Sequence, residues 1–207
     1  MDAFQAVSGY VTKMVSTGDG ATASNAAKMK ILLLDNDTVS VVSSATTQSA
    51  LLNHQVYLTD RLDNHNREKM RHLRCLCFVR PSPDSIQFLI DEFRDPKYGE
   101  YHIYFSNIVK KSSLERLAEA DDHEVVKAVH ECFADYLVVN PDLTSLALEH
   151  RLWSSSPDMW NQDSLSRTTE GVIALLLSLK KRPMIRFQKN SLLAKKLATE
   201  VRYQMTQ

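Results

Sequence analysis

Short apolar runs alternate with segments of helical periodicity through the first two thirds of the chain. The clearest run follows Lys30, where Ile31, Leu32, Leu33 and Leu34 stand together before Asp35. A continuous apolar run of this length is typical of a parallel strand that is covered on both faces. Similar runs complete the expected set of strands, which is residues 30–35, 56–59, 73–79, 102–106 and 135–139.

Apolar positions spaced three and four residues apart predict helices between these strands. The expected helices are residues 2–16, 48–53, 66–71, 82–93, 112–119 and 123–133. The helix from residue 82 has a clear start, because Ser82 can cap it, Pro83 suits its first turn and Asp84 complements its dipole. Alternating strands and helices predict a doubly wound, Rossmann-like α/β domain with a mostly parallel five-stranded sheet at residues 1–140.

The pattern changes after Pro141, and residues 141–207 are expected to begin a second α/β domain. Residues 149–163 predict a loop that holds Trp153 and Trp160. Residues 163–181 predict a long helix, 183–187 a short strand and 191–205 an amphipathic closing helix. A unit of this size buries little surface, so we expect this second domain to be incomplete within the chain.

Charge, cysteine usage and hydropathy narrow the class of protein. Lys and Arg total 25 and so do Asp and Glu, so the chain lacks the net positive field that favours nucleic acid or anionic lipid. An odd number of cysteines, Cys75, Cys77 and Cys132, predicts reduced thiols of a cytosolic protein, with a metal pair at Cys75 and Cys77 as the minor alternative. No signal peptide is recognisable, and the most apolar segment, residues 171–179, is too short to span a bilayer, so the protein is expected to be soluble.

Enzymatic sites are poorly supported by the sequence. Asp35 at the end of the first strand resembles the acid of a receiver-type phosphoacceptor, but the later strands lack the carboxylate and lysine that this chemistry needs. No glycine-rich turn follows Leu34, and no phosphate loop or nucleophile elbow is present. We therefore expect no catalytic residue, metal or cofactor, and keep a receiver-like or small α/β enzyme domain centred on Asp35 as the alternative.

Two apolar stripes separated by acids form the remaining candidate site. Leu114 and Leu117 lie one helical turn apart, and a second stripe holds Val126 and Val129 with Glu131 beside it. The acidic segment EADDHE lies between them. One interpretation is that both stripes cover the sheet. The other is a small apolar pocket with an acidic rim, which would suit a basic peptide with one large apolar anchor.

Several segments of the sequence resemble the SM family, the cytosolic proteins that bind syntaxins and guide SNARE assembly. Within this family the resemblance is to the endosomal and trans-Golgi, vacuolar protein-sorting type. The similarity covers most of the chain in order. The segments that carry it are KILLLDNDT, TQSALLNHQVYLTDRLD, NREKMRHLRCLCFVRP, RDPKYGEYHIYFSNIVKKSSLERLAEADD, DYLVVNPDL, LSRTTEGVIALLLSLKKRPMIRFQ and LAKKLATEV.

This resemblance implies that the first domain receives the N-terminal peptide of a Qa-SNARE in an outer pocket. Leu114 would form the apolar floor, Val129 would lie on the facing helix and Glu131 at the rim, with Leu117 and Val126 in support. The family's central SNARE cleft would use residues near the ends of the early strands, for which the weaker candidates are Asp35, Asp60, Arg61 and Arg67.

The resemblance also implies a cellular role and indicates how much of a family member this chain represents. It implies a non-enzymatic regulator of vesicle fusion, peripherally associated with endosomal, Golgi or vesicle membranes through its SNARE partner. Members of the family are much longer than this chain, and the domain that templates SNARE pairing is not represented. We therefore expect the sequence to correspond to the N-terminal part of such a protein, with peptide binding retained and SNARE-assembly activity in doubt.

Overall fold

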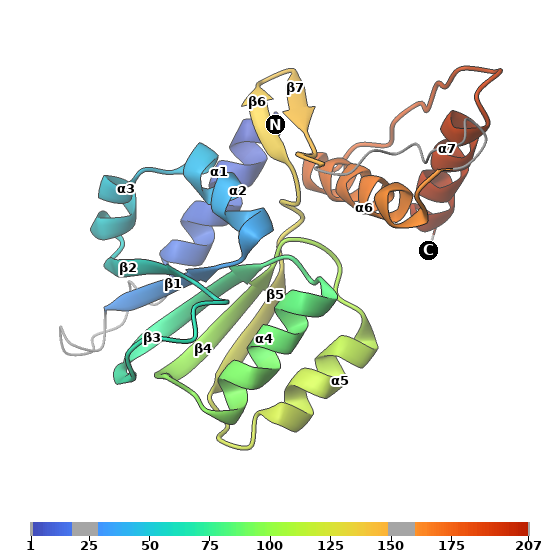
Figure 1. Ribbon diagram of the computed structural model, residues 1–207. Coiled ribbons are helices and arrows are strands. Elements are labelled where there is room, and N and C mark those ends of the chain that lie inside the picture. The colour runs from blue at the N-terminus through green and yellow to red at the C-terminus, as the bar shows by residue number, and fades with distance from the viewer. Residues whose placement is uncertain (1, 18–28, 149–159, 207) are drawn as a thin grey trace.

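The computed structural model describes residues 2–17, 29–148 and 160–206. Parallel strands form a five-stranded sheet in the order β2-β1-β3-β4-β5 (Figure 1). These strands are β1 Lys30–Leu34, β2 Val56–Arg61, β3 Met70–Val79, β4 Tyr98–Phe105 and β5 Val126–Glu131. The prediction of a doubly wound α/β fold around a five-stranded parallel sheet is confirmed.

Strand β1 shows why the sheet needs cover on both sides. All of its residues are buried, and Leu32 lies opposite Thr59 of β2 and Leu76 of β3. Successive side chains of a strand point to opposite faces, so Leu32 joins one hydrophobic cluster and Leu33 joins the other. Both faces of the sheet must therefore be covered by other elements.

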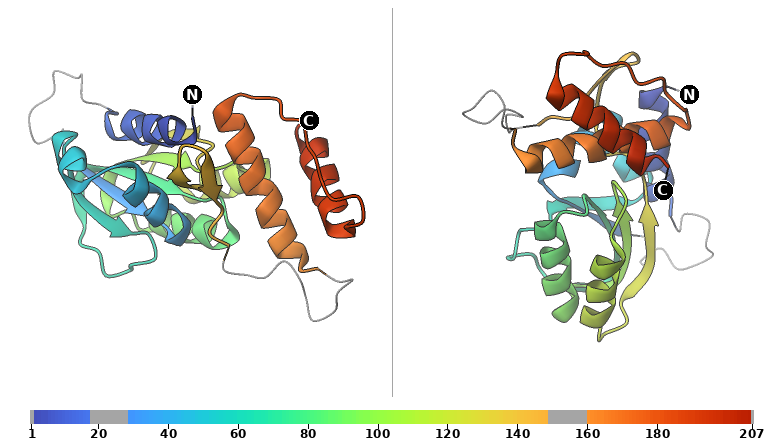
Figure 2. Two further views of the ribbon diagram at one scale, coloured as in Figure 1. Left: turned by 90° about the horizontal axis from the view of Figure 1, so that it is seen from above. Right: turned by 90° about the vertical axis from the view of Figure 1, so that its right-hand side faces the viewer.

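Helices supply this cover on the two faces (Figures 1 and 2). On one face lie α1 Ala3–Val15, α2 Asn36–Ala45 and α3 Gln48–Asn53, and on the other lie α4 Pro83–Arg94 and α5 Lys111–Ala120. Ser82 caps α4 by accepting a hydrogen bond from the Ser85 N–H, and Pro83 opens the helix, as predicted.

The fifth strand was assigned to the wrong residues in the prediction. Residues 123–133, expected to be a helix, contain β5, and Val129 lies opposite Ile103 of β4. Valines at positions 125, 126 and 129 fit a helical stripe as well as a strand, and a left-handed backbone at Glu124 (φ 51°) turns the chain out of any helix. Residues 135–139, expected to be the fifth strand, instead enter β6 Leu137–Asn140, which pairs antiparallel with β7 Leu143–Ser145.

One further local prediction was wrong and one helix was missed. Residues 66–71 form no helix, because the side chain of Arg67 turns into the protein and Met70 already begins β3. Helix α2 was not predicted, since its serines, threonine and valines are weak helix formers. Asp35 compensates by capping its first turn.

The C-terminal part consists of two helices, α6 Gln162–Leu179 and α7 Leu192–Gln204, close to the two that were predicted. Ala174 of α6 belongs to the cluster that contains α1, and Tyr136 and Ser178 share a hydrogen bond of 2.7 Å. Residues 183–187 were expected to be a strand, but they are irregular and exposed, with Met184 77% exposed. Most of the predicted tryptophan loop lies outside the described residues.

A buried ion pair fixes the chain between β2 and β3. Arg67 donates to Glu92 of α4 at 2.8 Å and to the carbonyl oxygens of Asn64 and Leu62 at 2.7 and 3.1 Å. The Tyr101 hydroxyl donates to the other oxygen of Glu92 at 2.5 Å. Both charged side chains are almost fully buried, so the pair compensates their charges, and Lys97 also contacts Glu92 at 3.3 Å.

We predict that Glu92→Ala lowers the free energy of unfolding by about 3–5 kcal/mol, because it leaves the Arg67 guanidinium buried without its counter-ion. Chemical denaturation would measure the loss. Asp95→Ala, which breaks the exposed pair between Lys69 and Asp95, is the control and should have little effect. Equal effects of the two substitutions would contradict the assignment of the buried pair.

Candidate functional site

Helix α5 provides the first half of the candidate site. Leu117 is buried in the core between α5 and the sheet, and Leu114, one turn earlier, is half-buried against the same core. The helix ends at Asp121, whose carboxylate accepts hydrogen bonds from the Val125 and Val126 N–H groups at 2.9 and 3.0 Å. Asp121 therefore fixes the turn that joins α5 to β5.

Strand β5 provides the second half, at the edge of the sheet. Val126 is half-buried, whereas Val129 is 42% exposed and Glu131 is exposed. Val129 and Glu131 lie opposite Ile103 and Phe105, whose side chains belong to the cluster beneath α4 and α5. Both residues thus face the α5 side of the sheet, although from a strand and not from the predicted helix.

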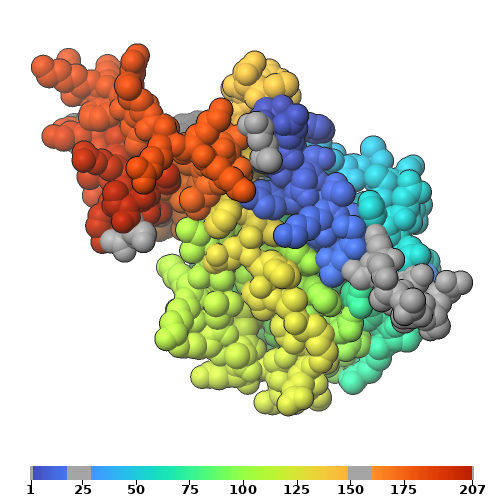
Figure 3. Space-filling model, turned by 180° about the vertical axis from the view of Figure 1, so that it is seen from behind, coloured from blue at the N-terminus to red at the C-terminus, as the bar shows by residue number. Residues whose placement is uncertain are grey.

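The structure thereby places all the residues predicted for the peptide site on one face of the sheet. We call them the α5–β5 surface, which comprises Leu114, Leu117, Val126, Val129 and Glu131. Strand β5 lies at the surface of the molecule, as the yellow region of Figure 3 shows. The exposed charged residues of α5, of β5 and of the turn between them carry both signs: the acids are Glu115, Glu119, Asp122 and Glu124, and the bases are Lys111, Arg116 and Lys127. The surface therefore offers a partly exposed apolar strip, with Glu131 at its end and charged residues of both signs on the same elements.

Asp35 and Arg67, two of the weaker cleft candidates, are buried. The Asp35 carboxylate accepts hydrogen bonds from the Thr38 N–H at 2.9 Å, the Arg80 N–H at 2.6 Å and the Ser85 hydroxyl at 2.8 Å. Burial raises the pKa of Asp35, while these hydrogen bonds act to lower it. Asp35 is thus occupied in joining β1, α2 and α4, which does not favour the receiver-like alternative.

Asp60 and Arg61, the other two cleft candidates, lie at the end of β2 and are partly exposed. Asp60 accepts hydrogen bonds from the Asn64 side chain at 3.2 Å, and Arg61 pairs with Asp63 at 2.8 Å. Arg67 belongs instead to the buried pair with Glu92. Of the four cleft candidates, only Asp60 and Arg61 are placed where a partner could reach them.

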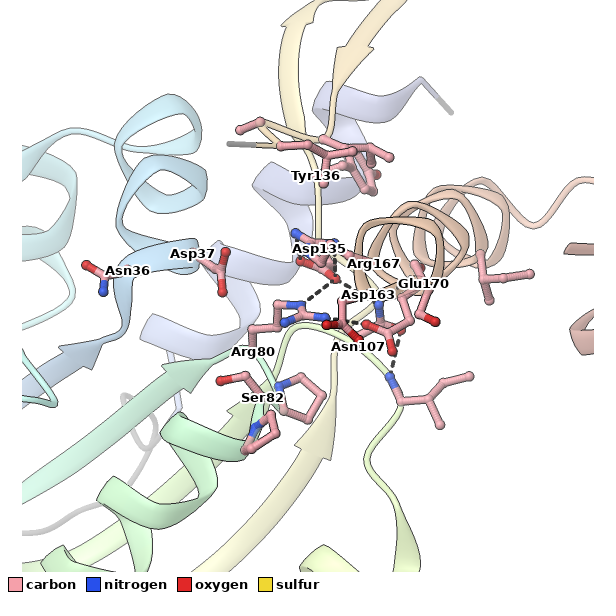
Figure 4. A pocket seen from close by; sticks show the side chains of 18 of the residues that line it. Asn36, Asp37, Arg80, Ser82, Asn107, Asp135, Tyr136, Asp163, Arg167 and Glu170 are labelled. Carbon is pink, nitrogen blue, oxygen red and sulfur yellow. Dashed lines mark hydrogen bonds and ion pairs between the residues drawn. The ribbon is translucent and has the colours of Figure 1, made fainter. Parts of the chain in front are cut away.

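A polar cleft that the sequence interpretation missed lies between α6 and the carboxyl ends of the strands, with a volume of about 1210 Å³. At its centre Arg167 donates two hydrogen bonds of 2.9 Å to Asp135, and Arg80 contacts Asp135 and Glu170 (Figure 4). Burial raises the pKa of Asp135, and the charges of Arg167 and Arg80 act to lower it. This network binds α6 to the sheet.

One signal could have revealed part of this network in the sequence. Arg80 is the first residue after β3 and Asn107 the second after β4, and side chains in such positions gather at the carboxyl edge of a parallel sheet. Arg167 carried no such signal, because the packing of α6 against this edge cannot be deduced from its periodicity.

The described residues can also be examined for metal-binding groups and for membrane-spanning helices. Within residues 2–17, 29–148 and 160–206, no group of three or more His, Cys, Asp and Glu side chains is arranged to hold a metal ion. Among the helices of these residues, none combines the length and the apolar character needed to cross a membrane.

A doubly wound parallel sheet with an exposed strip at its β5 edge and a polar cleft at its carboxyl edge defines an α/β module. The Sec1 family model matches residues 30–207, and the chain belongs to the Sec1 family. This finding confirms the resemblance to the SM family.

Individual relatives are vacuolar protein-sorting proteins. The chain is 56% identical over 175 residues to vacuolar protein sorting-associated protein 45 of Schizosaccharomyces pombe, covering 84% of this chain and 31% of that protein. It is 46% identical over 207 residues to the Homo sapiens protein of the same name, covering 100% of this chain and 34% of that one. The chain thus spans about a third of the length of these relatives.

Solved structures show the same similarity. The SM protein Vps45 in complex with the Qa SNARE Tlg2 has a TM-score of 0.93 and 66% sequence identity, over 100% of this chain and 36% of that one. Sly1p in complex with an N-terminal peptide of Sed5p has a TM-score of 0.79 at 20% identity over 100% of this chain and 39% of that one, which supports the fold alone.

We predict that Asp35→Ala lowers the free energy of unfolding by about 2 kcal/mol, because α2 loses its cap and buried donors lose their acceptor. Thermal and chemical denaturation would measure the change. Asp37→Ala removes an exposed acid two residues away and should cost less than about 1 kcal/mol. A fully stable Asp35→Ala protein would contradict the structural role of this carboxylate.

Proposed function

We propose that this chain binds a syntaxin-type Qa-SNARE and acts as a non-enzymatic regulator of vesicle docking and fusion in endosomal, trans-Golgi and vacuolar protein transport. The observation that carries the proposal is the match over the whole chain, at 66% identity and a TM-score of 0.93, to an SM protein solved in complex with a Qa SNARE. Membership of the Sec1 family and the identity to vacuolar protein sorting-associated proteins support the same transport route.

The α5–β5 surface is the part of the chain that we assign to the N-terminal peptide of the SNARE. Leu114 and Val129 offer apolar area that is only partly covered, so an apolar anchor of a peptide could gain by burying it. The carboxylate of Glu131 would favour a basic residue next to that anchor. Leu117 and Val126 would support this surface from below.

The proposal divides the chain in function as well as in sequence. Residues 1–140 would form the SNARE-binding α/β domain, and residues 141–207 would begin a second domain. Asp60 and Arg61 would be available to a second contact with the SNARE helices. Association with Golgi, endosomal or vesicle membranes would be peripheral and would depend on the SNARE.

We predict that Leu114→Arg reduces the affinity for an endosomal Qa-SNARE N-terminal peptide by at least about tenfold, because it introduces a charge where the apolar anchor would be buried. Isothermal titration calorimetry would measure the affinity, and circular dichroism would check the fold. Leu52→Arg adds the same charge at an exposed leucine of α3 and should not change the affinity.

A second variant covers the case in which Leu114→Arg disturbs the core. Val129 is already 42% exposed, so Val129→Asp should leave the protein folded and still weaken peptide binding. Wild-type affinity in both folded variants would exclude the α5–β5 surface as the peptide site. Absence of binding to the wild-type chain would count against the proposed function itself.

A further inference from the structure

The β4–α5 loop, residues 106–110, separates the α5–β5 surface from the polar cleft. On its outer side, the Val109 N–H donates a hydrogen bond of 2.9 Å to Oε1 of Glu131. Val109 itself is buried in the cluster beneath α4 and α5. Glu131 therefore holds this loop in place from β5, in addition to lining the proposed peptide site.

On its inner side the same loop is held by Asn107. Nδ2 of Asn107 donates to Oδ2 of Asp135 at 2.9 Å and to the backbone oxygen of Glu170 in α6 at 3.1 Å (Figure 4). Oδ1 of Asn107 accepts the Ile108 N–H at 2.8 Å, which fixes the start of the loop. The loop is thus bonded directly to α6.

The two carboxylates that hold the loop belong to one short segment, residues 131–135. This segment is bonded to the end of β4, since the Cys132 and Ala134 N–H groups donate to the carbonyl oxygens of Phe105 and Ser106 at 2.7 and 2.9 Å. Its last residue, Asp135, also accepts both hydrogen bonds from Arg167 of α6. These hydrogen bonds, together with the short backbone segment from Asn107 to Val109, therefore join Glu131 to the first half of α6.

We propose that Glu131 is a positioning residue, whose acceptor oxygen restrains the β4–α5 loop and, through Asn107, the contact between α6 and the sheet. This inference deepens the proposed function. It rests on that function only for the identity of the peptide that would contact Glu131. It follows that the α5–β5 surface and the α6 contact are energetically linked through residues 106–110.

Two substitutions of Glu131 separate its acceptor from its charge. Glu131→Ala removes both, whereas Glu131→Gln keeps an oxygen that can accept the Val109 N–H. Glu119→Ala is the matched control, because it removes the same charge from an exposed position of α5. Amide hydrogen exchange of the whole chain without peptide, followed in residues 106–110 and 162–171, reports the restraint.

We expect Glu131→Ala to raise exchange roughly tenfold in both segments, in keeping with the loss of a hydrogen bond to a charged group, and Glu131→Gln and Glu119→Ala to remain close to wild type. Unchanged exchange in residues 162–171 of Glu131→Ala would overturn the link to α6. If Glu131→Gln raised amide exchange as much as Glu131→Ala does, the role of the acceptor oxygen would be overturned.

Calorimetry with the Qa-SNARE N-terminal peptide allows this inference and the proposed function to be tested independently. Glu131→Gln, with the loop still protected, should bind the peptide more weakly because the charge is lost. A wild-type chain that binds no peptide would refute the proposed function while leaving the exchange result, and with it the positioning role, intact.

Discussion

The rest of the structure depends on one constraint, a parallel sheet whose central strands are apolar on both faces. β1 has no exposed residue, so helices must cover the sheet from either side. Covering the faces leaves the edges of the sheet, where polar and partly apolar groups can meet solvent or a partner. Two of them are the β5 edge and the carboxyl edge.

At the carboxyl edge, where many α/β proteins place their chemistry, this protein uses its polar side chains for internal contacts. Asp35 receives hydrogen bonds from Thr38, Ser85 and the Arg80 backbone, and Asp135 is paired with Arg167. These carboxylates join helices to the sheet. At the β5 edge, by contrast, Val129 remains exposed, which agrees with a surface that binds another chain.

Much of the fold could be predicted because local patterns and the buried sheet agree. The run Ile31 to Leu34 and the start of α4 at Ser82 are each explained by a few neighbouring residues. β5 was mistaken for a helix because Val125, Val126 and Val129 fit both periodicities, and only the pairing with β4 decides between them. α2 was missed because its stability comes from the cap at Asp35 and from tertiary packing, which composition does not reveal.

For the candidate site, the sequence could suggest residues but not their geometry. Leu114 and Glu131 are proposed from the apolar stripes and the family resemblance, yet the hydrogen bond from Val109 to Glu131 arises between residues 22 positions apart. The same is true of the contact between Asn107 and the Glu170 carbonyl oxygen, which requires α6 to pack against the sheet. Such contacts depend on the tertiary arrangement, so local sequence patterns do not predict them.

The measurement that tests this account most directly is a map of the amides that respond when the labelled chain is titrated with the N-terminal segment of an endosomal Qa-SNARE. Nuclear magnetic resonance would follow each amide. The account predicts that the largest changes fall on α5 and β5, around Leu114, Val129 and Glu131. Changes confined to the polar cleft near Arg80 and Asp135, or to the ends of β2, would contradict it.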